Sequence, residues 1–475
     1  MSEKSLDKSQ IKIRFFTRDE DETLRVSENP LFVPVSLKRF GLSEVVNHLL
    51  GNDLKQIPFD FLIEGDLLKS SIEEYLTVKG LSSETFLSLE YTRSVLPPSF
   101  LGSFSNEDWV SSIDLLPTME TVNKISSAAK IVSGSYDGIV RLYNLSGHVE
   151  KQFVGHSGQI KAVKFISPTR ILSAGNDRQI RLWKSKLSGN THNHLQKENL
   201  NLELELEEEE DEENIEDGTT LAILEGHKAP VVSLDVNSKT NRILSASYDK
   251  AIGVWSTRHK EMTLVEAIQS NNLSTQSRKR QKLALKDSSI PRKSPLSFLE
   301  GHSSPVEGVI FNPNDSTVGY SCSQDHTIKT WDLVTSRCVD TRTTSYSLLS
   351  ITCLSKLNLI LCGSSARHIT QHDPRINSNV SSNHQLVGHS NFVVSLDPSP
   401  NNDYMFSSAS HDGTVKVWDV RANKAMYTIF RENDNIKETK RKNKVFAVRW
   451  DNEIGIVSGG DDKKIQINKG SDIAK

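Results

Sequence analysis

The sequence lacks the features that mark membrane-spanning and secreted proteins. No window reaches the roughly 18 uninterrupted apolar residues that a membrane helix needs. The polar start MSEKSLDKSQ has no apolar core of the kind found in secretory signals. We therefore expect a protein of the cytosol or nucleus that does not enter a membrane.

Cysteine is scarce, and the common catalytic motifs are missing. The four cysteines, Cys322, Cys338, Cys353 and Cys362, form no Cys-x-x-Cys pair, so we expect no disulfide framework or zinc site and interpret them as small buried residues. We find no Gly-rich phosphate loop, no nucleophile elbow and no paired metal-ligand spacing. We expect no enzyme activity and no cofactor, and the net charge of −3 predicts no partner.

One short pattern recurs along most of the chain. An aspartate stands six residues before an apolar or aromatic residue at Ser135-Tyr136-Asp137…Tyr143, Gly175-Asn176-Asp177…Trp183, Ser247-Tyr248-Asp249…Trp255, Ser323-Gln324-Asp325…Trp331, Ser410-His411-Asp412…Trp418 and Gly459-Gly460-Asp461…Ile467. Four copies follow a Gly-His pair by 21 to 23 residues, at Gly155-His156, Gly226-His227, Gly301-His302 and Gly388-His389. Alternating apolar runs between these marks predict four-stranded blades. The pattern is the WD-repeat signature of a β-propeller.

The blades count to seven when one degenerate copy is included. Between residues 345 and 375, Leu348 to Leu354 and Leu359 to Cys362 read as strands, and His372-Asp373 stands in the place of Trp-Asp. The segment from Leu101-Gly102 to Trp109-Val110 is similar to a Gly-His segment without its histidine. We expect an N-terminal strand there to complete the last blade and close the ring, which removes exposed sheet edges.

The repeated His, Asp and Trp residues are chemically conspicuous but recur once per blade. In WD-type propellers these positions form a buried network in which the histidine bridges the turn aspartate and a strand hydroxyl. Because buried polar groups need partners, we interpret them as structural and not as metal-binding or catalytic.

Two blades carry long charged inserts after their third strand. Within the first, residues 185–218, 11 of the 15 residues from Glu203 to Asp217 are acidic, which favours a solvated loop over a site for a basic partner. The second, residues 257–297, has nine basic residues against three acids. The basic runs of the chain are Arg278, Lys279, Arg280 and Lys282; Arg292 and Lys293; and Lys440, Arg441 and Lys442 with Lys444.

These basic runs favour a nuclear protein. Import receptors and nucleic-acid phosphates both read short basic clusters in flexible loops. No aromatic residues are interleaved with the basic ones, so the stacking platform of a sequence-selective single-strand RNA binder is missing. Any contact of these runs with RNA would be electrostatic and sensitive to salt.

Residues 1–97 form a separate small domain before the propeller of residues 98–475. Ile11, Ile13 and Phe15 alternate as a strand, Leu42 to Leu50 follow helical spacing up to Gly51, and Phe59, Phe61 and Ile63 alternate again. A second helix starts at Ser70 or Ser71, each with a glutamate three residues on, and ends near Gly80. A last strand carries Leu87, Leu89 and Tyr91. This order predicts an α+β ubiquitin-like fold. The domain has no free Gly-Gly tail for conjugation, because the chain continues into the propeller, so we expect it to act by docking.

The combination resembles one family closely. The motifs Lys12-Ile13-Arg14-Phe15, Pro58-Phe59-Asp60-Phe61-Leu62-Ile63 and Gly102-Ser103-Phe104-Ser105-Asn106-Glu107-Asp108-Trp109 are similar to those of the WD-repeat ribosome-assembly factor of the nucleolar PeBoW complex. The resemblance implies that the propeller binds the Bop-type WD-repeat protein, next to pescadillo, on precursors of the large ribosomal subunit, where the complex is needed for rRNA maturation. It also implies that a midasin-type AAA ATPase grips the ubiquitin-like domain and strips the factor from the particle, in the nucleolus or nucleoplasm.

The resemblance assigns one residue to that release step. In the family an acidic residue before the last strand of the ubiquitin-like domain completes the coordination of a metal ion held by the ATPase, and the matching residue here is Glu84. A hard cation such as Mg²⁺ accepts a carboxylate oxygen as a ligand. Two other functions stay open: a generic nuclear adaptor of the ubiquitin pathway, which would be insensitive to metal chelation, and direct RNA recognition by the basic loops, which would depend steeply on salt.

Overall fold

The computed structural model describes residues 10–18, 21–51, 57–68, 70–82, 86–94, 97–120, 126–127, 129–185, 218–265, 290–376, 385–422, 424–431 and 443–470. Strands dominate these residues, and the helices are few and short, which confirms the predicted mainly β fold. No helix within the described ranges is long and apolar enough to cross a membrane.

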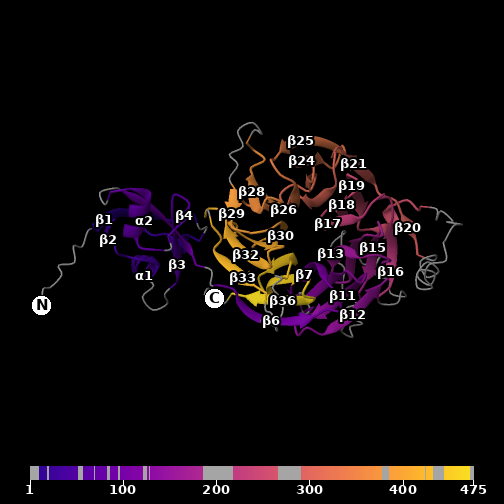
Figure 1. The fold of residues 1–475 in the computed structure, drawn as a ribbon, viewed down its shortest axis with the longest axis horizontal. Coiled ribbons are helices and arrows are strands. Elements are labelled where there is room, and N and C mark those ends of the chain that lie inside the picture. The colour runs from indigo at the N-terminus through magenta and orange to yellow at the C-terminus, as the bar shows by residue number, and fades with distance from the viewer. Residues whose placement is uncertain are drawn as a thin grey trace, which may run out of the picture.

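The N-terminal part is a five-stranded mixed sheet in the order β2-β1-β5-β3-β4, covered by a helix (Figure 1). β1 runs parallel to β5, and the other neighbours are antiparallel. Leu42 and Val46 of the first helix are fully buried in one cluster with Ile13, Phe15 and Phe61 of the sheet. The elements are β1 (Gln10–Phe16), η1 (Glu22–Leu24), β2 (Leu31–Pro34), α1 (Arg39–Leu49), β3 (Phe59–Ile63), β4 (Asp66–Leu67), α2 (Ile72–Lys79) and β5 (Leu87–Arg93).

The ends of the two helices follow from local chemistry. The Ser71 hydroxyl accepts a hydrogen bond from the Glu74 backbone N–H at 3.3 Å, which selects Ser71 as the N-cap of α2. Gly80 ends α2 in the left-handed region, at φ 68°, where glycine carries no steric penalty. α1 begins at Arg39, about a turn before Leu42, where the apolar spacing begins. The apolar spacing does not reveal this first turn, because Arg39 and Phe40 are exposed.

Seven β-sheets within the described residues form a ring of blades after this domain (Figure 1). Blade 1 consists of β7 (Val110–Leu116), β10 (Lys130–Ser135), β11 (Ile139–Asn144) and β12 (Val149–Val154). Blade 2 consists of β13 (Ile160–Ser167), β14 (Arg170–Gly175), β15 (Ile180–Lys184) and β16 (Thr220–Leu224). Blade 3 consists of β17 (Val231–Asn237), β18 (Arg242–Ser247), β19 (Ala251–Ser256) and β21 (Ser297–Glu300).

The second half of the ring repeats the same order of strands. Blade 4 consists of β22 (Val306–Phe311), β23 (Val318–Ser323), β24 (Thr327–Asp332) and β25 (Arg337–Thr343). Blade 5 consists of β26 (Leu348–Leu354), β27 (Leu359–Ser364), β28 (His368–His372) and β29 (Gln385–Val387). Blade 6 consists of β30 (Val393–Pro398), β31 (Met405–Ser410), β32 (Thr414–Asp419) and β33 (Tyr427–Phe430). Blade 7 consists of β34 (Val445–Asp451), β35 (Gly455–Gly460), β36 (Lys464–Lys469) and β6 (Ser99–Ser105).

The ring is closed by the N-terminal strand, as predicted. β6 pairs antiparallel with β36, from Lys464 opposite Ser105 to Lys469 opposite Ser99. The inner strands of neighbouring blades pack against one another around the ring, including β34 of blade 7 against β7 of blade 1. Closure therefore joins residues from the start and the end of the propeller in one sheet.

Three features differ from the sequence-based expectations or add to them. Cys338 is exposed, whereas the other three cysteines are buried as predicted, because it lies on the outer strand β25. The basic insert contributes a short strand, β20 (Arg292–Lys293), which pairs in parallel with β16 and gives blade 2 a fifth strand. Short elements outside the blades are β8 (Met119–Glu120), β9 (Ser126–Ser127) and η2 (His259–Glu261).

Candidate functional site

Four blades share one buried network of histidine, aspartate, serine and tryptophan. In blade 2, His156 Nδ1 lies 2.7 Å from Asp177, and its Nε2 lies 2.7 Å from the Ser173 hydroxyl. Trp183 Nε1 donates to the same hydroxyl at 2.7 Å. The matching sets are His227, Asp249, Ser245 and Trp255 in blade 3; His302, Asp325, Ser321 and Trp331 in blade 4; and His389, Asp412, Ser408 and Trp418 in blade 6. Because both ring nitrogens of each histidine are engaged, these residues hold the blades together.

The network also keeps its aspartates charged. Burial by itself raises the pKa of the Asp249 carboxyl, but the hydrogen bond from His227, the charge of His227 and two backbone hydrogen bonds together outweigh it. The backbone N–H groups of Lys228 and Ala251 donate to the same carboxylate at 2.9 and 3.0 Å, and the pKa falls to about 2. The turn of each of these four blades is thus fixed by an ionised carboxylate with several donors.

Blade 7 replaces the histidine of the network with an arginine. Arg431 donates to both carboxylate oxygens of Asp462, at 2.7 and 2.8 Å, and to the Ser458 hydroxyl at 2.7 Å. Asp462 is therefore the turn aspartate of this blade, and it accepts from the Lys464 backbone N–H as Asp177 does from Gln179. The sequence-based assignment of Asp461 and Ile467 to this pattern was wrong by one residue, because the missing histidine and aromatic removed the marks that fix the register.

Blades 1 and 5 depart from the network in different ways. In blade 1, the Tyr143 hydroxyl lies 3.1 Å from Asn106 Oδ1, so asparagine and tyrosine take the places of histidine and tryptophan. In blade 5, His372 pairs with Ile360 as Trp183 pairs with Ile171 in blade 2, which confirms the predicted degenerate blade. Burial, aided by the charge of Arg342, lowers the pKa of His372 to about 4.

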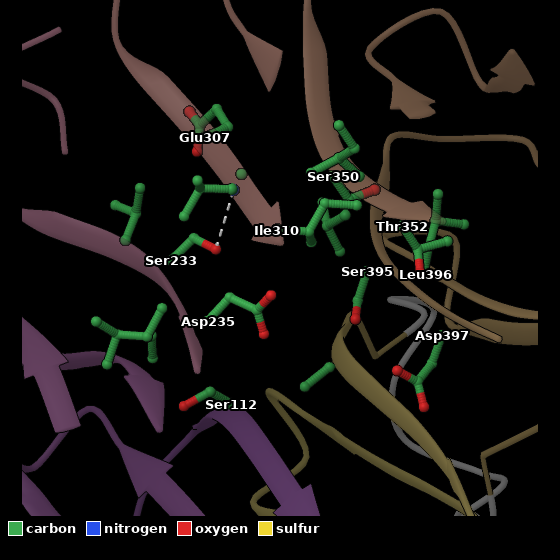
Figure 2. A pocket seen from close by; sticks show the side chains of 18 of the residues that line it. Ser112, Ser233, Asp235, Glu307, Ile310, Ser350, Thr352, Ser395, Leu396 and Asp397 are labelled. Carbon is green, nitrogen blue, oxygen red and sulfur yellow. Dashed lines mark hydrogen bonds between the residues drawn. The ribbon is translucent and has the colours of Figure 1, made fainter. Parts of the chain in front are cut away.

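The central channel is lined by side chains of the inner strands and has a volume of about 340 Å³. Figure 2 shows Asp235, Glu307 and Asp397 around this space, with serines from four strands between them. Arg449 Nη1 lies 2.6 Å from Asp397 and its Nε 3.4 Å from Asp114.

The charges of the channel are matched across blades. Lys164 Nζ lies 3.7 Å from both Asp114 and Asp235, so acids and bases alternate from blade 6 to blade 3 through Asp397, Arg449, Asp114, Lys164 and Asp235. The three aspartates also accept backbone N–H groups from the next blade, those of Phe165, Phe311 and Trp450. These side chains tie neighbouring blades together.

An exposed aromatic surface spans blades 6, 7 and 1. We call it the aromatic arc and define it as Phe392, His411, Phe446, Trp109 and Tyr136, whose neighbouring ring centroids lie 5.3 to 6.1 Å apart. Phe392 and Trp109 are 44% and 40% exposed. Lys161 Nζ lies 4.3 Å above the Tyr136 ring, and Phe446 also lines the channel. Tyr136, His411 and Phe446 are partly buried between the two exposed rings, and none of the hydrogen bonds of the blade networks involves the five rings.

Sequence reasoning missed the arc because its members are scattered from residue 109 to residue 446. A signal does exist in the repeats. Tyr136 and His411 directly precede the turn aspartate of their blades, and Trp109 and Phe392 directly precede an inner strand. Repeats aligned on the aspartate place Tyr136 and His411 in one column, and repeats aligned on the start of the inner strand place Trp109 and Phe392 in one column. Aromatic residues in these two columns predict one face.

The residues predicted to contact partners lie outside the described residues. They are Glu84, Arg278, Lys279, Arg280, Lys282, Lys440, Arg441 and Lys442. On either side of Glu84 in the sequence, Leu81 and Phe86 are 39% and 46% exposed. The Arg292 and Lys293 run is no free basic cluster, because Lys293 is buried and donates to the Met262 carbonyl oxygen at 2.8 Å. No group of three or more His, Cys, Asp or Glu residues in the described ranges could hold a metal ion.

Comparisons with known proteins match both parts of the chain. Residues 11–76 match the NLE (NUC135) domain. Residues 98–144, 147–184, 218–256, 293–332 and 380–419, which contain the first three strands of blades 1 to 4 and 6, match the WD domain, G-beta repeat. The chain is similar to the ribosome biogenesis protein YTM1 of Debaryomyces hansenii, at 63% identity over 483 residues, and of Scheffersomyces stipitis, at 64% over 482 residues. It is 60% identical over 476 residues to that of Saccharomyces cerevisiae (strain S288c), and each of these alignments covers 99% of both chains.

Proposed function

The chain belongs to the family of the ribosome biogenesis protein YTM1, and on that premise we propose how its two parts act. As a member of this family it is a ribosome assembly factor. We propose that it works on precursors of the large subunit in a PeBoW-type complex with pescadillo and a Bop-type WD-repeat protein, in the nucleolus and nucleoplasm. In this scheme it has no catalytic step of its own.

The aromatic arc is the observation that supports partner binding by the propeller. Trp and Tyr are enriched among the residues that dominate the energy of protein interfaces, because they bury large areas with few rotamers. The arc collects five rings from three blades, and the ion pairs and networks beneath it fix the backbone that carries them. A partner that docks there meets a surface whose shape exists before binding, which lowers the entropy lost on association.

The test compares one pair of exposed aromatic residues of the arc with a single exposed aromatic residue outside it. Trp109→Ala with Phe392→Ala removes both ends of the arc, whereas Phe430→Ala removes a ring that is 69% exposed on the outer strand β33. The proposal expects the double variant to lose most of its affinity for the purified Bop-type partner and the Phe430 variant to keep it. Equal affinity in all three proteins would exclude the arc as the docking surface.

The N-terminal domain supplies the contact through which the factor is released. We propose that Glu84 gives one carboxylate oxygen to a magnesium ion held by the adhesion-site domain of a midasin-type ATPase. The exposed apolar side chains of Leu81 and Phe86 lie on either side of Glu84 in the sequence, and they are suited to contact the adhesion-site domain around the metal ion. The ATPase provides the free energy for release, and this chain provides the residue that the ATPase binds.

The basic runs fit the cellular place of this work. Arg278, Lys279, Arg280 and Lys282 in one insert, and Lys440, Arg441 and Lys442 in another, are proposed as import signals, with contacts to pre-rRNA phosphates as the second possible use. Import assays on variants with alanine in each run separate the two uses. Loss of an import signal lowers the amount of the protein in the nucleus, whereas loss of an RNA contact leaves that amount unchanged.

A further inference from the structure

A buried arginine of blade 6 contacts the N-terminal domain. Arg421 follows β32 and donates from Nη1 to Glu90 of β5 at 2.9 Å. Its Nε and Nη2 donate to the two carboxylate oxygens of Asp419 at 2.9 and 2.7 Å, and its guanidinium lies 4.0 Å from the centroid of the Tyr404 ring. The side chains of Arg421 and Glu90 are each only 9% exposed.

Blade 5 contains the same local arrangement without the second domain. Arg375 donates to the two oxygens of Asp373 at 2.9 and 2.7 Å, with the same two-residue spacing as Arg421 and Asp419. The side chain of Arg375 is 64% exposed. The local Asp-x-Arg turn is thus a property of the blade, whereas the burial of Arg421 comes from the N-terminal domain that covers it.

Two more contacts join blade 6 to the same face of the N-terminal domain. Tyr427 of β33 is surrounded by residues of that domain: burial raises the pKa of its hydroxyl, as does the charge of Asp60, while hydrogen bonds with Ser94 and Arg39 lower it. Gly65, in the turn between β3 and β4 with φ 83°, lies against the Arg421 carbonyl oxygen, and a Cβ atom there would come within 2.9 Å of that oxygen. Figure 1 shows the N-terminal domain at the edge of the ring where β32 and β33 lie.

From these contacts we infer that blade 6 clasps the N-terminal domain through Arg421 and Glu90, and that Arg421 is a positioning residue for β5. β5 is the central strand of the sheet, between β1 and β3, so a contact at Glu90 orients the whole sheet. In any other arrangement Glu90 loses its 2.9 Å partner and keeps only Arg18 at 3.7 Å, while Arg421 keeps only Asp419. The buried pair therefore favours one orientation of the two parts.

With the clasp in place, a force applied to the N-terminal domain is transmitted to the propeller through two connections. One runs from β5 through Glu90 to Arg421 and blade 6, and the other runs along residues 94–98 into β6, the closing strand of blade 7. Both connections end in neighbouring blades of the ring. This consequence rests on the proposed docking of the ATPase, whereas the clasp itself does not.

The clasp is tested by distances between spin labels on the full-length chain. One label goes on Cys338, the exposed cysteine of the four, and the other on Val78→Cys in α2, where the native side chain is 79% exposed. We expect one narrow distance distribution in the otherwise unchanged protein and in the control Arg375→Ala. Arg421→Ala broadens the distribution, and Glu90→Gln, which keeps the shape but loses the charge, broadens it less.

The outcomes separate the clasp from the docking proposal. An unchanged narrow distribution in both Arg421→Ala and Glu90→Gln would overturn the clasp, and a matching thermal unfolding midpoint shows that each variant is folded. Glu84→Ala is expected to keep the narrow distance distribution but to lose its affinity for the adhesion-site domain of the ATPase. Arg421→Ala is expected to keep binding that isolated domain, because Glu84 is not part of the clasp.

Discussion

Arg431 binds Asp462 with two parallel hydrogen bonds, at 2.7 and 2.8 Å, in the place where a histidine stands in four other blades. The side chains are 3% and 6% exposed. The planar guanidinium satisfies the carboxylate and still reaches the Ser458 hydroxyl with Nη1. One blade thus keeps the function of the network after losing both its histidine and its tryptophan.

Replacement of this arginine should destabilise the propeller strongly. Arg431→Ala leaves the carboxylate of Asp462 buried without its main partner, and loss of one member of a buried pair costs about 3–5 kcal/mol. Arg375→Ala, which breaks an exposed Asp–Arg pair, serves as the control, with an expected loss of about 0–1 kcal/mol. Urea unfolding measures both, and equal losses would contradict the structural role of Arg431.

His372 makes the stability of blade 5 depend on pH. Its pKa is about 4 in the folded protein, below the 6.5 of a free histidine, so the folded state binds fewer protons than the unfolded chain. The stabilisation is complete above pH 6.5 and is lost as pH falls toward 4, by on the order of 3 kcal/mol. His372→Gln should flatten the pH dependence of the unfolding free energy in this window. The exposed His148→Gln should leave the slope as it is, and a slope unchanged by His372→Gln would count against the assignment.

Glu84 should decide whether the ATPase can dock. Glu84→Ala removes the proposed metal ligand and is expected to abolish binding to the adhesion-site domain, while Glu84→Asp, shorter by one methylene, is expected to reduce it. Glu44→Ala, an exposed glutamate on α1, is the matched control. Calorimetry with the magnesium-loaded domain measures the affinities. Normal binding by Glu84→Ala refutes the proposed contact.

Removal of residues 1–97 should separate joining from release. The cut leaves β6 intact, since that strand begins at Ser99, so the ring can still close. The truncated chain is expected to enter precursor particles and to remain there, and it should inhibit growth in cells that also hold the full-length protein. A truncated chain that never reaches the particles would show that the N-terminal domain is needed for joining.

Much of the fold could be predicted because the same residue pattern recurs in several blades of the propeller. The spacing of Gly-His, Asp and Trp located blades 2, 3, 4 and 6, and the alternation in Leu348 to Leu354 located β26 although blade 5 lacks the network. Blade 7 was placed with its turn shifted by one residue. There the chain uses Arg431, 31 residues before Asp462, and no local pattern reveals a pair so far apart.

The surfaces that act on partners were harder to predict, for two physical reasons. The aromatic arc depends on ring closure, which brings Trp109 beside Phe446, and periodicity within one repeat carries no trace of that contact. The clasp joins Glu90 to Arg421, which is 331 residues away and lies in a turn that looks the same as the one in blade 5. Glu84 came from family resemblance alone, because an exposed loop carboxylate has no pattern that marks it.

The association of the chain with ribosome precursors tests the central claim most directly. A tagged full-length chain is purified from nuclear extract and sedimented, and each fraction is probed for large-subunit precursor rRNA and for the Bop-type and pescadillo partners. Our account predicts that the chain sediments with large-subunit precursors together with both partners. A chain found only in light fractions, free of precursor rRNA, would contradict it.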